Sequence, residues 1–208
     1  MSVSDDELAD GYRRFRATHW PDARAEYETL AQGQKPHTLI VACSDSRADP
    51  ALIFDAAPGQ LFVVRNVANL VPPYEPDGQL HGVSAALEFG VKVLEVQRIV
   101  VMGHAHCGGV NAMLNGAPDS CRDFVAPWVA QGEPVVRHIA ESVAPDQVER
   151  AAEEAVVRLS LDNLRTFPWI AEREAAGVLT LTGLHFGIGD GILTRLQDAG
   201  RFVPVTRD

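Results

Sequence analysis

The sequence predicts an α/β fold with a mostly parallel central β-sheet flanked by helices. Three short runs, residues 38–42, 61–64 and 98–102, are rich in Val, Ile and Leu and show no alternation of apolar with polar residues. Such runs are typical of strands covered on both faces, as in a parallel sheet. A helical pattern lies between the second and third runs, and strands that alternate with helices indicate an α/β domain.

Helices are predicted before, between and after these strands. Ser4 and Glu7 have the spacing of a capping box, which indicates that a first helix begins there, and Pro21 is expected to end it. Pro168 is expected to stop a later and longer helix, because proline disfavours the helical conformation of the residue before it. Further helices are expected over residues 22–31, 81–93 and 146–167, and a fourth strand over residues 178–181.

The chain length suits one sizeable domain. With 208 residues and no internal repeat or low-complexity run, we expect a single domain over residues 1–208. It would consist of an N-terminal helical arm, residues 1–33, and an α/β core, residues 34–208. Leu8 and Tyr12 share one face of the first predicted helix, so the arm is amphipathic.

Composition and charge exclude several classes of protein. An apolar share of 46% and a charged share of 22% are those of a globular chain, not of a disordered or collagen-like one. The net charge of -10 argues against a protein held mainly on nucleic acid, which needs a basic face. The acidic N-terminus does not resemble a signal peptide, and no apolar stretch is long enough to span a membrane. We therefore expect a cytoplasmic protein without nucleic-acid or membrane partners.

Two of the three cysteines follow predicted strands. Cys43 comes directly after the first strand, and the third strand runs into a turn that holds His104 and Cys107. Because the carboxyl ends of parallel strands meet at one edge of a sheet, these three side chains are expected to lie close together. Two sulfurs and one nitrogen suit zinc, and three protein ligands leave a fourth position open, as in catalytic zinc sites.

Other roles for these cysteines are weaker. A single cysteine after a strand is usually a small buried apolar residue, but the coincidence of a second strand-end cysteine with a His-x-x-Cys turn disfavours that interpretation. A phosphate-binding cysteine loop needs an arginine six positions after Cys43, where this chain has Asp49. A disulfide oxidoreductase needs Cys-x-x-Cys, which is absent.

Asp45 and Arg47 follow Cys43 within the same loop. A carboxylate near a metal site can accept a hydrogen bond from a water molecule on the metal. Arg47 can keep Asp45 ionised through a charge-assisted hydrogen bond. We therefore predict that this pair takes part in catalysis, although a loop pair of this kind can also be a solvated contact of little energetic value.

At these residues the sequence resembles the β-class carbonic anhydrases. The resemblance rests on Cys43-Ser-Asp-Ser-Arg47 and on His104-x-x-Cys107-Gly-Gly. It extends to residues 58–69 (PGQLFVVRNVAN) and 160–168 (SLDNLRTFP), and it covers roughly residues 30–195. The resemblance implies reversible hydration of carbon dioxide to bicarbonate and a proton, by hydroxide on one zinc ion per subunit.

The resemblance also implies residue roles and an assembly. Zinc would be held by Cys43, His104 and Cys107, with Asp45 and Arg47 as the catalytic pair. A dimer would be the smallest active unit, as a homodimer or homotetramer, and the N-terminal helices would pack on a partner subunit.

The substrate pocket is a further expectation from the resemblance. It would be formed by Gln34, Phe62, Val67, Phe89 and Gly109, with Gln34 donating to bicarbonate from across the dimer. Plant-like members have a tyrosine where this chain has Phe89, so a hydroxyl contact is lost there.

One departure from the family concerns regulation. Some members bind bicarbonate at a non-catalytic pocket through a tryptophan, an arginine and a tyrosine, and then move the aspartate onto zinc. The corresponding residues here are Ile40, Arg65 and Phe186. With two of the three missing, we expect no such pocket, and a site that stays open with Asp45 paired to Arg47.

Two alternatives to this function stay open on the sequence. The same zinc site could hydrolyse carbonyl sulfide or carbon disulfide, and a non-catalytic relative could retain the fold. His106 is not expected to be a ligand, because neighbouring residues on such a turn point in different directions. Cys121 is expected to be a spare thiol, and the sequence assigns no residue to proton transfer.

Overall fold

A computed structural model describes residues 5–206 of the chain. The chain divides into two compact units, Met1–Lys35 and Pro36–Asp208. Ser4, and with it the predicted capping box, lies outside the described residues. No helix among the described residues is long and apolar enough to cross a membrane.

The first unit consists of two helices, α1 (Asp5–Thr18) and α2 (Trp20–Leu30). The expectation that Pro21 ends the first helix is wrong. Pro21 lies in the first turn of α2, where the missing N–H of proline has no helical partner to lose. The rings of Phe15, Trp20 and Tyr27 contact one another, with centroids 5.2 to 6.3 Å apart.

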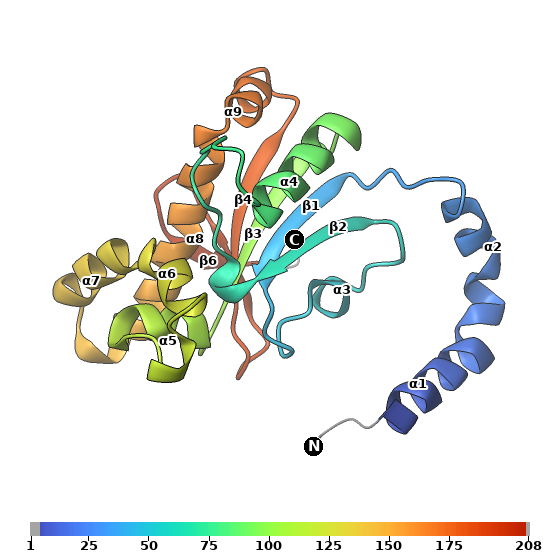
Figure 1. The fold of residues 1–208 in the computed structure, drawn as a ribbon, viewed down its shortest axis with the longest axis horizontal. Coiled ribbons are helices and arrows are strands. Elements are labelled where there is room, and N and C mark those ends of the chain that lie inside the picture. The colour runs from blue at the N-terminus through green and yellow to red at the C-terminus, as the bar shows by residue number, and fades with distance from the viewer. Residues whose placement is uncertain (1–4, 207–208) are drawn as a thin grey trace. The chain divides into compact units, whose positions relative to one another are not determined.

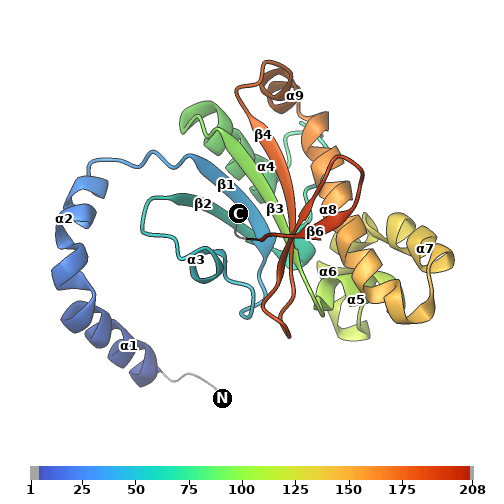
Figure 2. The same ribbon diagram turned by 180° about the vertical axis from the view of Figure 1, so that it is seen from behind.

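The second unit is built on a six-stranded sheet with the order β2-β1-β3-β4-β5-β6, and the prediction of an α/β fold with a mostly parallel sheet is confirmed (Figures 1 and 2). Its strands are β1 (Thr38–Cys43), β2 (Leu61–Asn66), β3 (Arg98–His104), β4 (Thr180–Phe186), β5 (Leu193–Leu196) and β6 (Phe202–Pro204). The first four pair in parallel. The last two are antiparallel and were not predicted.

Strand boundaries differ from the prediction where the chain reaches the carboxyl edge of the sheet. The fourth strand was expected over residues 178–181, but β4 begins at Thr180 and continues to Phe186. Gly183 and His185 interrupt the apolar pattern in the second half of β4, so the sequence did not indicate a strand there. The glycine has a role in packing. A Cβ on Gly183 would lie 3.0 Å from side-chain carbons of Leu161 and Val157, so the missing side chain lets a helix pack closely.

The helices of the second unit pack partly on the sheet and partly on one another. They are α3 (Pro50–Ile53), α4 (Gly82–Glu88), α5 (Gly108–Asn115), α6 (Val125–Ala130), α7 (Glu133–Ser142), α8 (Val148–Thr166) and α9 (Pro168–Ala175), and a π-helical turn, Phe89–Val93, extends α4. Short 3-10 turns span Val67–Asn69, Asp119–Cys121 and Pro145–Gln147. Leu39, Val41 and Ile99 pack against α4 and α8 in one buried cluster.

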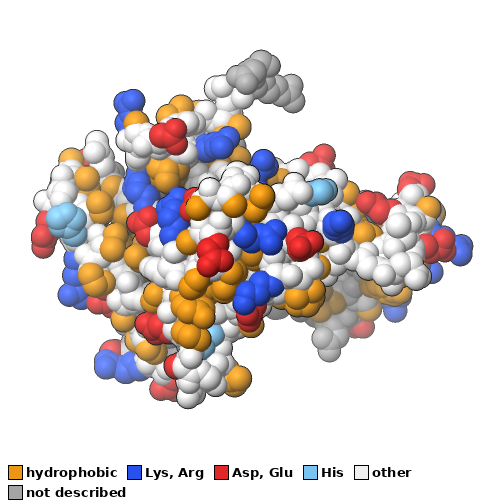
Figure 3. All heavy atoms as spheres, turned by 90° about the horizontal axis from the view of Figure 1, so that it is seen from above, with side chains coloured by type: hydrophobic (Ala, Val, Ile, Leu, Met, Phe, Trp, Pro, Cys, Tyr) orange, Lys and Arg blue, Asp and Glu red, His pale blue; other side chains and the backbone are white. Residues whose placement is uncertain are grey.

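The opposite face of the sheet carries a smaller cluster, which includes Ile40, Val100 and Leu184 and is covered partly by residues of α3. A hollow of about 320 Å³ lies on this face, lined in part by these three residues and by Thr182. On the face of the molecule seen in Figure 3, acidic and basic side chains are interspersed, and hydrophobic side chains lie between them.

Candidate metal centre

Three potential ligands meet at the carboxyl edge of the sheet. Cys43 is the last residue of β1 and His104 the last residue of β3, and these two strands are neighbours. Cys107 precedes α5, three residues after His104. The Sγ atoms and the His104 ring nitrogen all lie within 4.8 Å of one another, and all three residues are buried. The strands extend to the ligands themselves, slightly beyond their predicted ends.

The geometry of this group fits a tetrahedral metal ion. Cys43 Sγ and Cys107 Sγ lie 3.9 Å apart, close to the separation of about 3.8 Å expected for two thiolates bound at about 2.3 Å in a tetrahedral zinc site. His104 Nδ1 donates a hydrogen bond to the carbonyl oxygen of Ala105 at 2.9 Å. The lone pair therefore lies on Nε2, which is buried and has no hydrogen-bond partner among the described residues.

The two thiols have opposite pKa shifts. The hydrogen bond from Cys107 lowers the pKa of Cys43 to about 4 against the effect of burial, with further help from His104 and the backbone of Asp45. The same hydrogen bond and burial raise the pKa of Cys107, since a second thiolate would stand beside the first. Ionisation of one sulfur therefore disfavours ionisation of the other. A divalent cation between them removes this repulsion, so the donor set favours metal binding.

His106 lies between two ligands in the sequence but points away from them. Its φ of 55° places it in the left-handed region. The ring is exposed, and its Nδ1 lies 3.3 Å from Oε1 of Glu149 on α8. The group of possible metal ligands found among the described residues does not include His106.

Asp45 and Arg47 form a bidentate ion pair beside the cluster. Arg47 Nε donates to Asp45 Oδ1 at 3.0 Å and Nη2 donates to Oδ2 at 2.7 Å, while the backbone N–H of Arg47 donates to Oδ1 at 2.9 Å. These hydrogen bonds from Arg47 hold the pKa of Asp45 well below its usual range, so the carboxyl group is ionised. Arg47 also donates to the carbonyl oxygen of His106, which ties the loop after β1 to the loop after β3.

Arg65 holds the first of these loops in place. Its guanidinium donates to the carbonyl oxygens of Cys43 at 2.9 Å and Asp45 at 2.6 Å. It also donates to Asp49 Oδ2 at 2.7 Å, and Asp49 in turn caps α3. Ile40, one of the residues that replace the expected regulatory set, is buried within β1, the strand that pairs with the Arg65 strand β2.

Val67 and Gly109 lie together next to the cluster. A Cβ on Gly109 would lie 2.7 Å from Val67 Cγ1 and 2.8 Å from Ala68 Cβ, so only glycine permits this approach. Ala68 has a φ of 65°, and Trp128 Nε1 fixes the segment by donating to the carbonyl oxygen of Val67 at 2.8 Å. Two of the five expected substrate residues are thus neighbours of the cluster.

Of the other three expected substrate residues, Phe62 and Phe89 lie apart from Val67 and Gly109. Phe62 and Phe89 stack on each other with centroids 5.9 Å apart. Phe62 precedes Asn66, the end of β2, by four residues, which corresponds to about 13 Å along a strand. Gln34 belongs to the other compact unit of the chain.

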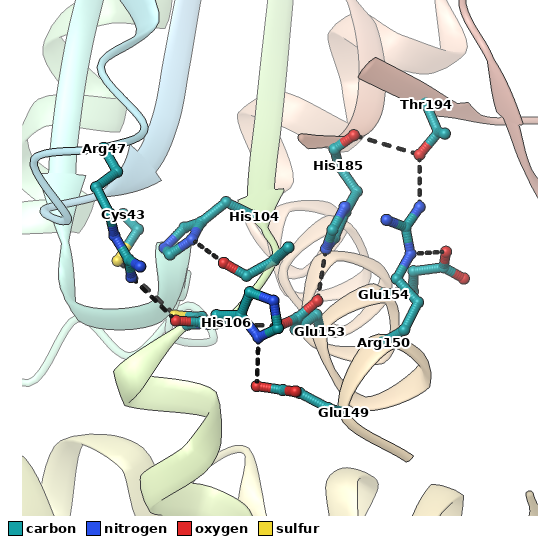
Figure 4. A network of polar contacts seen from close by, with 12 residues as sticks. Cys43, Arg47, His104, His106, Glu149, Arg150, Glu153, Glu154, His185 and Thr194 are labelled. Carbon is teal, nitrogen blue, oxygen red and sulfur yellow. Dashed lines mark hydrogen bonds and ion pairs between the residues drawn. The ribbon is translucent and has the colours of Figure 1, made fainter. Parts of the chain in front are cut away.

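A second pair, in which a carboxylate contacts a histidine, lies behind the ligands and was not predicted from the sequence. Glu153 on α8 and His185 on β4 are buried, with Glu153 Oε2 at 2.7 Å from His185 Nε2 (Figure 4). The signal was present, because Glu153 is a charged residue between Ala152 and Val156 on the apolar stripe of a long helix. Its partner is distant in the sequence and gave no such signal.

The sequence of the chain is similar to a known protein family and to several of its members. A family model described as "Carbonic anhydrase" matches residues 38–193. The chain is 35% identical over 189 residues to "Beta carbonic anhydrase 5, chloroplastic" of Arabidopsis thaliana, covering 89% of this chain and 62% of that protein. It is 38% identical over 199 residues to a "Carbonic anhydrase" of Pseudomonas aeruginosa, covering 94% of this chain and 89% of that protein.

Solved structures give the same result. The β-carbonic anhydrase CcaA superimposes with a TM-score of 0.88 at 31% identity, covering 97% of this chain and 92% of that one. A Coccomyxa β-carbonic anhydrase in complex with acetazolamide has a TM-score of 0.81 at 25% identity, covering 99% and 89%. A structure of tetrameric β-carbonic anhydrases from Sordaria macrospora gives 0.73 at 29% identity, covering 97% and 96%.

Proposed function

The chain belongs to the β-carbonic anhydrase family, and from this premise we propose that it interconverts carbon dioxide and bicarbonate at a zinc ion held by Cys43, His104 and Cys107. The observation that carries the proposal is the buried ligand group, in which three donor atoms converge and His104 Nε2 has no partner among the described residues. Cysteine and histidine in this number suit zinc and leave one coordination position for the reaction.

When bound, zinc lowers the pKa of a water molecule to about 7, as in carbonic anhydrases that hold the metal through three histidines, and so supplies the nucleophile. Asp45 accepts a hydrogen bond at its carboxylate and thereby orients the attacking group. Arg47 keeps this carboxylate ionised and fixed in one direction through two parallel hydrogen bonds. Val67, packed beside Gly109, offers an apolar surface for carbon dioxide.

The test is a stopped-flow hydration assay combined with metal analysis of the purified chain. We expect about one zinc per chain, loss of hydration activity with a chelator, and recovery when zinc is restored. Purified protein without zinc, or zinc-loaded protein without hydration activity, would refute the proposal. Assays of carbonyl sulfide and carbon disulfide on the same preparation separate the hydratase from a hydrolase that uses the same site.

We also propose that the chain assembles as a dimer or tetramer, with the N-terminal helices packed on a partner subunit. Phe62 and Phe89 stack on each other and lie apart from Val67 and Gly109, so a second copy would have to supply the phenylalanine side chains expected beside these two residues. Exposed Leu8 and Tyr12 give the arm an apolar surface to bury. One solved relative is described as tetrameric.

Light scattering of the full chain tests the assembly. We expect the mass of a dimer or tetramer, and a smaller mass after Leu8→Asp and Tyr12→Asp are combined, because charges on the arm oppose its burial. A wild-type monomer that retains full activity would contradict the proposal.

Cytoplasmic residence stays a prediction, which cell fractionation tests.

The open state of the site is part of the same proposal. Asp45 is bound to Arg47 through three hydrogen bonds, two of them from the guanidinium, and Ile40 is buried in the sheet. We expect a structure of the zinc-loaded protein at pH near 8 to keep Asp45 on Arg47. Asp45 on zinc in such a structure would overturn this expectation.

A further inference from the structure

Glu153 and His185 form a fully buried pair on the inner side of the ligand turn. His185 Nε2 and Glu153 Oε2 lie 2.7 Å apart, within hydrogen-bond distance. The side chains are 2% and 0% exposed. In the view of Figure 4, Cys43 and Arg47 lie on one side of His104, and Glu153 and His185 lie on the other.

Both residues are joined to the ligands through the backbone. The second carboxylate oxygen of Glu153 accepts from the backbone N–H of Cys107 at 3.4 Å. His185 stands opposite Gly103 in the register of β3 with β4, and the next pair in the ladder is His104 with Phe186. The pair therefore connects α8 and β4 to the turn that carries two of the three expected zinc ligands.

Close packing keeps water away from this pair. A Cβ on Gly103 would lie 2.8 Å from Val157 Cγ2 and 3.7 Å from the carbonyl oxygen of Glu153. The glycine lets α8 approach β3 directly behind the ligand turn. In such a place a carboxylate has no solvent to screen it, so its hydrogen bonds and its charge act strongly on their neighbours.

Burial of this carboxylate has a free-energy cost that an apolar pair of similar size would avoid. Stability alone therefore does not account for its presence. The carboxylate oxygen that accepts from the backbone N–H of Cys107 fixes the direction of the turn that carries this ligand. Histidine donating to the carboxylate fixes its rotamer, as outer hydrogen-bond partners do in other metal sites.

We propose that Glu153 and His185 are positioning residues for the metal centre: Glu153 holds the Cys107 turn in the geometry that binds zinc, and His185 orients Glu153. The inference rests on the proposed function in that it assumes zinc to be the occupant of the ligand group. Its test reads zinc affinity in addition to activity, so the two can fail separately.

The experiment measures the zinc dissociation constant of the full chain by competition with a chromophoric chelator. Glu153→Gln keeps the size of the side chain and removes its charge, and we expect zinc to bind about 10- to 100-fold more weakly. Glu154→Gln is the matched control, because Glu154 is the next residue of α8 and pairs with Arg150 and Arg158 instead. We expect its zinc affinity to equal that of the wild type.

Two substitutions of His185 separate positioning from general packing. His185→Gln retains a donor near the position of Nε2 and should keep zinc affinity near that of the wild type. His185→Leu removes the donor and should weaken zinc binding about tenfold or more. The visible spectrum of the cobalt-substituted protein should change in His185→Leu and Glu153→Gln but not in His185→Gln or Glu154→Gln.

Wild-type zinc affinity and cobalt spectrum in both Glu153→Gln and His185→Leu would overturn the inference, even if both variants unfold more easily. Equal weakening by Glu154→Gln would overturn it too. If Glu153→Gln does not fold, the contrast between the two His185 variants decides on the same readouts. Zinc binding that depends on Glu153 in a chain without hydration activity would uphold the inference and refute the proposed function.

Discussion

Two carboxylate pairs flank the ligand group, and they differ in burial more than in geometry. Asp45–Arg47 and Glu153–His185 both have a contact of 2.7 Å. The Arg47 side chain is 49% exposed, whereas that of His185 is fully buried. Water screens the first pair, so its main effect is on the reacting group beside it. Nothing screens the second, so it affects both the stability of the fold and the metal centre.

The largest effect is expected at Cys107, whose backbone N–H donates to Glu153 and whose neighbour His106 accepts a hydrogen bond from Arg47. Cys107→Ala removes one of two sulfurs, so we expect zinc binding and hydration activity to fall below detection, measured by metal analysis and stopped flow. Cys121→Ala is the control, since this thiol lies outside the ligand group. Loss of zinc from Cys121→Ala, or full activity in Cys107→Ala, would contradict the assignment.

The next largest effect is on stability, and it compares a buried histidine with an exposed one. His185→Leu leaves Glu153 without its donor in the core, and we expect the free energy of unfolding to fall by about 3 kcal/mol in a denaturant titration of the metal-free protein. His81→Leu is matched to it, because His81 also lies 2.7 Å from a carboxylate, that of Asp77, but at the surface. It should leave the stability nearly unchanged. Equal losses in both variants would show that burial is not the cause.

The contrast also explains what could be predicted from the sequence. Asp45 and Arg47 are two residues apart and directly follow a ligand, so their pairing could be inferred from local spacing. Glu153 and His185 are 32 residues apart and meet only because α8 packs on β3 next to β4. Their contact depends on the tertiary fold, and in particular on Gly103, whose effect on packing is not visible in a sequence.

The same distinction holds for the fold. β1 and β3 were predicted because each contains an apolar run that is buried almost along its whole length. β2 has a similar run although it is only half-buried, and only the first half of β4 was predicted, because Gly183 and His185 interrupt its apolar pattern. β5 and β6 were missed because they are short and only partly buried, so they carry no apolar run. The expectation for Pro21 was wrong because proline is compatible with both the end of one helix and the first turn of the next.

A smaller effect is expected at the exposed pair itself. Asp45→Asn keeps the size of the side chain and removes the acceptor charge, so we expect kcat for hydration to fall about 100-fold. Zinc content should equal that of the wild type, because Asp45 is not in the ligand group. Unchanged kcat would show that Asp45 serves only to hold the loop, and loss of zinc would show that it supports the metal.

The smallest effect tests how much of the role of Arg47 depends on its shape. Arg47→Lys keeps the positive charge but cannot donate in parallel to both oxygens of Asp45, as the guanidinium does. Loss of one such hydrogen bond corresponds to roughly a fivefold decrease in kcat. The melting temperature should shift by less than about 2 °C, because the side chain is half-exposed and surface pairs contribute little. A large fall in melting temperature would mean that the hydrogen bond from Arg47 to the carbonyl oxygen of His106 holds the two ligand loops together. The exposed Asp45–Arg47 pair would then stabilise the fold, as the buried Glu153–His185 pair is expected to do.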